Sequence, residues 1–201
     1  MKAARLLIAS PSNKPTTLLH CPTLRTPRLL LRRFEQSDAA FVLAGLSHPE
    51  VIKYYGVQYH SMEAVQTQMN WYEQLLAEGT GVWWCVCTAN GEMPIGACGF
   101  NGVQALHRKA ETGYWLMPQH QGHGYMHEAM QAALQHAFDV LQLHRIEAVV
   151  ETENRASMLL AERLGFRLEG TQRDVEWREG RFVSHHLYGL LANEWTPGPA
   201  Q

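Results

Sequence analysis

The chain has 201 residues, of which 46% are hydrophobic, 18% charged and 9% aromatic. These values indicate a globular domain and exclude a disordered, collagen-like or coiled-coil protein. Its 17 Lys and Arg residues nearly balance 19 Asp and Glu residues, for a formal net charge of −2, so the chain lacks the positive excess of a general nucleic-acid binder. No apolar stretch approaches the roughly 18 residues that a membrane span needs, and the first ten residues carry too short an apolar run for a secretory signal.

The four cysteines stand at positions 21, 85, 87 and 98. Cys85 and Cys87 lie in the apolar run WWCVC, where a C-x-C spacing directs both side chains to one face of a strand. The C-x-x-C spacing of a redox or zinc site is missing. We therefore expect reduced, buried cysteines in a cytoplasmic protein.

Residues 1–22 show no hydrophobic periodicity and predict a flexible extension, before a domain over 23–195 and a tail over 196–201. A short strand follows Pro27, a helix begins near Asp38, and a short helical piece begins near Pro49. Ser61 is typical of a helix N-cap. The helix that it starts has one apolar stripe and ends at Gly79 and Gly81; the stripe consists of Met62, Val65, Met69, Tyr72, Leu75 and Leu76.

A run of strands comes next, over 81–88, 94–103 and 109–117, with Asn90-Gly91 as a hairpin turn between the first two. A glycine-containing loop then leads into a long helix predicted from Tyr125 to Leu143. A strand over 145–152 precedes a helix capped by Asn154 and ended by Gly165. Two final strands, near 167–177 and 182–192, complete the pattern.

The order of these elements predicts the fold class. The strand, helix and strand over 110–152 form a βαβ crossover, which implies a parallel pair. The hairpins on either side imply antiparallel pairs. We therefore expect a single α/β (α+β) domain with a mixed, mostly antiparallel sheet and helices on both faces.

The segment ETGYWLMPQHQGHGYMHEA, residues 111–129, is the most informative one. Gly122 and Gly124 allow a close approach of the backbone to a ligand. The first turn of the following helix offers unpaired N–H groups and a positive dipole end. Together they suit an anion such as a pyrophosphate, although an ordinary strand-to-helix connection has the same spacing. The pattern matches neither the P-loop nor G-x-G-x-x-G.

Gln119-His120-Gln121-Gly122-His123-Gly124 resembles the Q/R-x-x-G-x-G/A pattern of the GNAT superfamily of N-acetyltransferases. Three further segments, over 110–116, 154–166 and 169–191, resemble its ribosomal-protein N-terminal acetyltransferase (RimJ/RimL) branch, and the resemblance covers roughly residues 24–195. It implies a central parallel pair of strands that part, acetyl-CoA as the co-substrate, and a primary amine as the acceptor.

The resemblance also implies site residues. Backbone groups of Trp115, Leu116 and Met117 would bind the pantetheine arm. Asn154 would contact the pantetheine or the acceptor, or serve only as a helix N-cap. Ser157 would protonate the leaving thiolate, or only bond its own backbone. The pyrophosphate would lie on the loop residues Gln119, His120, Gln121, Gly122, His123, Gly124 and Tyr125. This loop carries imidazoles where Arg or Lys is usual.

Two glutamates are candidates for the general base that the acceptor amine needs. Glu176 occupies the position implied by the ribosomal branch and is preferred; Glu111 lies on the strand where many other family members keep their base. For either residue, an ordinary exposed strand glutamate is the alternative. Ser184 replaces an acidic residue that is common in similar sequences, which puts ribosomal-protein specificity in question. The histidines lack the H-E-x-x-H arrangement, so we expect no metal.

The predicted reaction is direct transfer of acetyl from acetyl-CoA to a primary amine, either a protein N-terminus or a small molecule such as a polyamine, an antibiotic or an amino acid. A non-catalytic acyl-CoA sensor is the alternative of a different class. We expect a monomer or homodimer without nucleic-acid or membrane partners.

Overall fold

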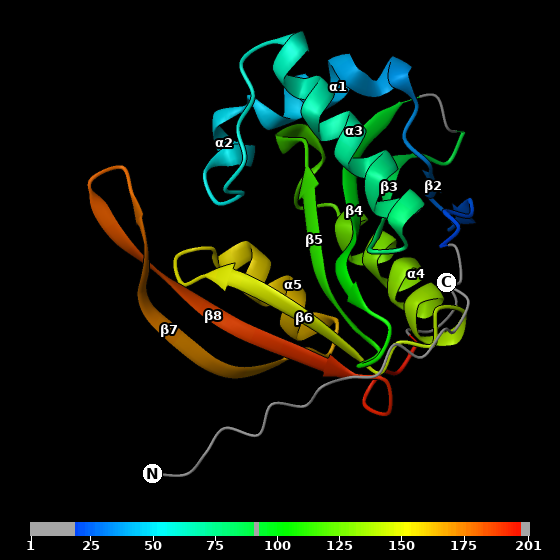
Figure 1. Ribbon diagram of the computed structural model, residues 1–201, viewed down its shortest axis with the longest axis vertical. Coiled ribbons are helices and arrows are strands. Elements are labelled where there is room, and N and C mark those ends of the chain that lie inside the picture. Colours follow the sequence, from blue (N-terminus) through cyan, green and yellow to red (C-terminus); the bar gives the residue numbers. More distant parts are fainter. Residues whose placement is uncertain (1–18, 91–92, 198–201) are drawn as a thin grey trace.

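A mixed eight-stranded sheet organises the protein (Figure 1), whose computed structural model describes residues 19–90 and 93–197. The strand order is β1-β2-β3-β4-β5-β6-β8-β7. The strands are β1 (Leu24–Arg25), β2 (Leu29–Arg32), β3 (Val82–Thr88), β4 (Pro94–Gln104), β5 (Lys109–Leu116), β6 (Arg145–Glu151), β7 (Arg167–Arg178) and β8 (Arg181–Leu191). The pair β5 and β6 is parallel and the other neighbouring pairs are antiparallel, which confirms the predicted fold class.

Helices cover both faces of this sheet. They are α1 (Ala39–Leu46), α2 (Pro49–Ile52), α3 (Met62–Glu78), α4 (Tyr125–Asp139) and α5 (Arg155–Arg163), with short 3₁₀ turns η1 (Gln36–Asp38) and η2 (Pro118–His120). One core cluster joins α1 and α3 to the sheet residues Trp83, Cys85, Cys87 and Trp115. A second cluster joins α4 and α5 to the opposite face. In the described part of the chain, no helix is long and apolar enough to cross a membrane.

The predicted helix caps are confirmed. The Ser61 hydroxyl accepts a hydrogen bond from the Ala64 N–H (3.1 Å), and Gly79 ends α3 in the left-handed region (φ 68°). The Asn154 side chain accepts from the Ser157 N–H (3.1 Å) at the start of α5. Gly165, with φ 90°, follows the end of that helix. Local sequence therefore determines where these two helices begin and end.

The predicted end of α4 is wrong: the helix ends at Asp139, four residues before Leu143. Gln142 adopts a left-handed conformation (φ 55°), and its side-chain amide donates to the carbonyls of Phe138 (3.2 Å) and Asp139 (2.7 Å). The chain thereby leaves the helix while Leu143 remains buried. The apolar stripe continues past the helix end because Leu143 is buried there, and hydrophobic periodicity does not distinguish a buried helical residue from a buried residue after the helix.

β5 and β6 are paired over only three residues each. Lys109, Ala110 and Glu111 align with Arg145, Ile146 and Glu147, and no later register pair joins the two strands. Beyond these pairs the strands part, as Figure 1 shows. The expected parting of the central parallel pair is confirmed, and it opens the middle of the sheet.

The hairpin of β7 and β8 projects beyond the rest of the sheet (Figure 1). Glu179 (φ 50°) and Gly180 (φ 82°) both take positive φ in its turn, as a tight hairpin of matching twist requires. In the predicted hairpin turn at Asn90-Gly91, Gly91 lies outside the described residues, and the Thr88 N–H donates to the Met93 carbonyl (3.0 Å).

The chain contacts the domain before the expected boundary at residue 23. Cys21 packs against the core, and the Pro22 carbonyl accepts from the Trp84 indole N–H (2.8 Å). Residues 1–18 of the predicted extension and 198–201 of the predicted tail lie outside the described residues. All four cysteines are free, and Cys85 and Cys87 lie buried on one face with their sulfurs 3.7 Å apart.

Candidate active site

A cavity of about 920 Å³ occupies the opening between β5 and β6. Its lining includes Tyr54 and Trp71 from the side of α2 and α3, and Gly122 and Ser157 from the side of α4 and α5. Because these helices cover opposite faces of the sheet, the cavity passes from one face to the other. An extended ligand can therefore enter from the α4 side and meet a second ligand on the α2 side.

The loop before α4 forms the first end of the cavity. Gly122 and Gly124 both have φ 78°, a conformation that favours glycine. The N–H groups of His120 and Gln121 donate to the carbonyls of Met117 (2.9 Å) and Pro118 (3.1 Å). Within the described residues, no hydrogen bond uses the N–H groups of residues 122–125. These four donors lie at a helix N-terminus, an arrangement that suits an anion, and they span fewer residues than the predicted loop.

A cation that sequence reasoning missed lies beside this loop. The Arg28 guanidinium donates to the His123 carbonyl (3.0 Å) and to Glu128 (2.6 Å), and it stacks 4.7 Å from the ring centroid of Tyr125. Burial alone would raise the pKa of Glu128, but hydrogen bonds from Thr26 and Arg28 outweigh it and lower that pKa. Arg28 thus fixes the loop to α4 from 95 positions away, a separation that no local motif reveals.

The imidazoles of the loop lie around Tyr125. The ring centroids of His120 and His123 are 6.4 and 5.9 Å from that of Tyr125. Neither histidine lines the cavity, nor do Gln119 and Met117, whereas Gln121, Tyr125 and the unpredicted His127 do. The histidines can therefore affect a bound anion mainly through charge, without forming the wall.

Backbone groups of β5 face the opening in alternation. The Met117 N–H donates to the Ile95 carbonyl on β4 (2.9 Å), and the Met117 carbonyl accepts from His120. Trp115 is in register with Ala97 and, two residues before Met117, also directs its backbone N–H and carbonyl toward β4. The backbone N–H and carbonyl groups of Tyr114 and Leu116 therefore point the other way, toward the opening. The Gln121 side chain donates to the Leu116 carbonyl (3.0 Å). Of the three residues predicted to bind the pantetheine arm, Leu116 is therefore the one whose backbone groups face the opening.

Ser157 on α5 forms a pair with Tyr114 on β5. The two hydroxyl oxygens are 2.7 Å apart across the opening, and both residues line the cavity. Burial raises the pKa of Tyr114 to about 12, so this phenol keeps its proton at neutral pH. Asn154 also lines the cavity while it caps α5. Tyr114 was missed because its role depends on a partner 43 positions away.

The two candidate bases are placed differently. Glu111 lines the cavity but its side chain is exposed to solvent. Partial desolvation, followed by the negative charge of Glu147, raises its pKa. Glu176 does not line the cavity. Its carboxylate is 40% exposed and pairs with Arg178 (3.3 Å) and His185 (3.5 Å). The structure brings Glu111, Ser157 and Asn154 together around one cavity and leaves Glu176 on the hairpin beyond it.

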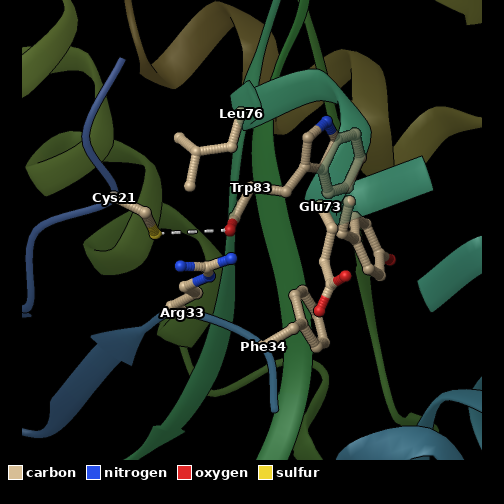
Figure 2. Close-up of a pocket in the computed structure, with 7 residues that line it drawn as sticks. Cys21, Arg33, Phe34, Glu73, Leu76 and Trp83 are labelled. Atoms are coloured by element: carbon tan, nitrogen blue, oxygen red, sulfur yellow. Dashed lines mark hydrogen bonds between the residues drawn. The ribbon is translucent and has the colours of Figure 1, made fainter. Parts of the chain in front are cut away.

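A second hollow, between β2, α3 and β3, has a volume of about 10 Å³ (Figure 2). Cys21 points into it and donates to the Trp83 carbonyl (3.6 Å). Burial raises the pKa of this thiol to about 12, so it is not a thiolate at neutral pH. The hollow has room for about one water molecule and is no candidate for a substrate site.

Known proteins resemble the chain over most of its length. The acetyltransferase (GNAT) domain family matches residues 28–167. The uncharacterized N-acetyltransferase p20 of Bacillus licheniformis is 35% identical over 175 residues, 87% of this chain and 98% of that protein. The ribosomal-protein-serine acetyltransferase of Escherichia coli is 35% identical over 97 residues, 48% of this chain and 54% of that protein. The crystal structure of spermidine N-acetyltransferase from Vibrio cholerae, in complex with CoA and spermine, superposes with a TM-score of 0.74 at 25% identity, covering 83% of this chain and 96% of that one.

Proposed function

The chain belongs to the GNAT family of acetyltransferases and is an N-acetyltransferase, and from this premise we propose that it transfers acetyl from acetyl-CoA to the N-terminal amine of a protein in the cytoplasm. One observation carries the proposal: a single cavity connects a loop suited to a pyrophosphate with an open second end on the other face of the sheet. The likeness to an enzyme named for a ribosomal-protein serine supports a protein N-terminus as the acceptor.

The residues around the first end fit acetyl-CoA. Its pyrophosphate suits the free N–H groups of residues 122–125, which point from a helix N-terminus. Its pantetheine arm suits the backbone edge of β5 near Leu116, since an amide-containing chain can bond there as a strand would. Asn154 and Ser157 form the opposite wall, where the thioester would arrive.

Direct transfer needs a neutral amine and an acid for the leaving thiolate. The amine nitrogen attacks the thioester carbonyl, the carbon–sulfur bond breaks, and the thiolate takes the proton of the Ser157 hydroxyl. The Tyr114 hydroxyl, 2.7 Å from Ser157, can replace that proton. Glu111, one of the carboxylates on the cavity wall, can accept the amine proton through a chain of water molecules. Glu176, the base implied by the resemblance, remains a prediction that also requires water between it and the cavity.

A second candidate acceptor is a small polyamine. Three carboxylates line the cavity, those of Glu50, Glu111 and Glu151, together with aromatic rings such as Tyr54 and Trp71. Acidic and aromatic groups both attract cationic amines. The structural likeness to a spermidine N-acetyltransferase is compatible with this alternative.

An acceptor screen tests the proposal. CoA thiol release would be followed with acetyl-CoA alone, with a serine-initiated tripeptide amide, and with spermidine. We expect turnover of the peptide. Turnover of spermidine alone would replace the protein N-terminus by a polyamine, and tight binding of acetyl-CoA without release by any amine would favour the sensor.

A further inference from the structure

We propose that Glu151 is the carboxylate that binds the acceptor's cationic nitrogen and holds it beside Ser157. The assignment deepens the proposed function and rests on it, because it takes the acceptor to be an amine. Sequence reasoning did not single out Glu151, which ends an apolar strand and belongs to none of the motifs.

The alternation of side chains along β6 determines which face of the sheet the Glu151 side chain points to. Ile146, Ala148 and Val150 pack in the core cluster that contains α4. Successive strand residues point to opposite faces, so Glu147, Val149 and Glu151 face the side of α2 and α3. Glu151 is therefore on the acceptor face, at the end of β6 where the two parallel strands have parted.

The carboxylate of Glu151 is buried, and only one of its two oxygens has a partner. Glu151 is 6% exposed and lines the cavity. Its Oε1 forms an ion pair with Arg178. Within the described residues its Oε2 is buried and has no hydrogen-bond partner. A buried charged oxygen without a donor is costly, and an N–H donor from a ligand in the cavity would remove that cost.

Arg178 holds this carboxylate in place and connects β6, the β7–β8 hairpin and α2 at the acceptor end of the cavity. Besides Glu151, its guanidinium contacts Glu176 (3.3 Å) and donates to the Lys53 carbonyl (3.4 Å) at the end of α2. The two carboxylates and the guanidinium carry one formal net negative charge among them. The balance favours a cationic ligand over a neutral or anionic one.

The turn after β6 connects Glu151 directly to the helix that carries Ser157, the proposed acid for the thiolate. The Asn154 N–H donates to the Glu151 carbonyl (2.9 Å), and the Ser157 N–H donates to the Asn154 side chain (3.1 Å). These bonds fix the short segment that carries both residues, and both residues line the same cavity. The proposal therefore takes the nitrogen bound by Glu151 to be the reacting nitrogen of the acceptor.

The test compares Glu151→Gln with the matched control Glu153→Gln. Glu153 is two positions away and exposed, pairs with Arg181, and does not line the cavity. The acceptor is whichever of the serine-initiated tripeptide amide and spermidine the wild-type protein acetylates. We expect Glu151→Gln to raise the acceptor KM by about 10- to 100-fold, the scale of one lost hydrogen bond to a charged group. The KM for acetyl-CoA should stay within about threefold, and Glu153→Gln should resemble wild type.

The acetylated product separates charge recognition from damage to the site. Its amide nitrogen carries no charge, so its inhibition constant should change less than about threefold in Glu151→Gln. A parallel rise in the acceptor KM and the product inhibition constant would overturn the proposal, as would an unchanged acceptor KM or a large loss of kcat alone. Glu151→Asp keeps the charge and should retain much more acceptor affinity than Glu151→Gln, which guards against a folding defect in one variant.

The outcomes for the two proposals are distinguishable. If only spermidine is acetylated, the protein N-terminus fails as the acceptor and Glu151 is tested with spermidine. If neither probe is acetylated, calorimetric binding of spermidine in the presence of CoA decides the role of Glu151. Equal affinity of wild type and Glu151→Gln, or no binding by wild type, would then overturn the assignment.

Discussion

The two ends of the cavity are built in different ways. The end at α4 comes mainly from one contiguous segment, residues 114–126, and offers mainly backbone groups. The end at α2 is assembled from α2, α3, β6 and the β7–β8 hairpin, and offers side-chain carboxylates and aromatic rings. A backbone site depends on local conformation, whereas a side-chain site depends on which charges the fold brings together. The first end is therefore readable from a motif and the second is not.

The largest expected effect comes from the base at the acceptor end. Glu111→Gln should lower kcat by about 10²–10⁴-fold, the usual contribution of a positioned general base. Partial desolvation and Glu147 raise the pKa of Glu111, so wild-type activity should decline as pH falls through a value above the ordinary 4.5 of a glutamate, because the protonated carboxyl cannot accept a proton.

Glu176→Gln provides the comparison for that experiment, with an acceptor of pKa near 9 assayed at neutral pH so that little free amine is present. We expect a smaller loss of kcat than for Glu111→Gln, since Glu176 lies outside the cavity lining. If Glu176→Gln is the more damaging change, the base belongs to the hairpin, as the family resemblance implies.

The acid should give the next largest effect. Ser157→Ala should lower kcat by about 10²-fold, because the leaving thiolate loses its proton donor. Tyr114→Phe removes only the group that reprotonates Ser157 and should cost less. Acetyl-CoA affinity, measured by calorimetry, should change little in both variants, and a large loss of affinity would show that the pair binds the coenzyme instead.

At the backbone end, Gly122→Ala should weaken acetyl-CoA binding by about tenfold or more, the scale of lost hydrogen bonds to a charged group. Gly102→Ala is the matched control. Gly102 also has positive φ (60°) with no atom near the added Cβ, and it does not line the cavity. Both variants carry similar backbone strain. Equal acetyl-CoA affinity of the two variants in calorimetry would therefore show that the loop does not bind acetyl-CoA.

The smallest effect should come from the loop imidazoles. Neither His120 nor His123 lines the cavity, so replacing both by Gln should weaken acetyl-CoA binding by no more than about threefold in calorimetry, the scale of a screened charge. A loss of tenfold or more would show that the imidazoles contact the bound anion directly.

Sequence reasoning succeeded where a residue type has one strong local preference. Ser61 and Asn154 as caps, Gly79 and Gly165 as helix ends, and the parallel crossover all follow from neighbouring residues. It failed at the end of α4, because Gln142 ends the helix with a side-chain cap that an apolar stripe does not report.

The sequence by itself determined the order of elements, the fold class and the glycine loop, because propensity, capping and periodicity act over a few residues. Only the tertiary structure decided the charges of the site. It placed Arg28 beside a loop 95 positions away, paired Ser157 with Tyr114, kept Glu111 in the cavity and Glu176 outside it, and left one oxygen of Glu151 unpaired. The reason is physical: a side chain's electrostatic environment depends on burial and on partners from distant segments, and neither is encoded in the spacing of neighbouring residues.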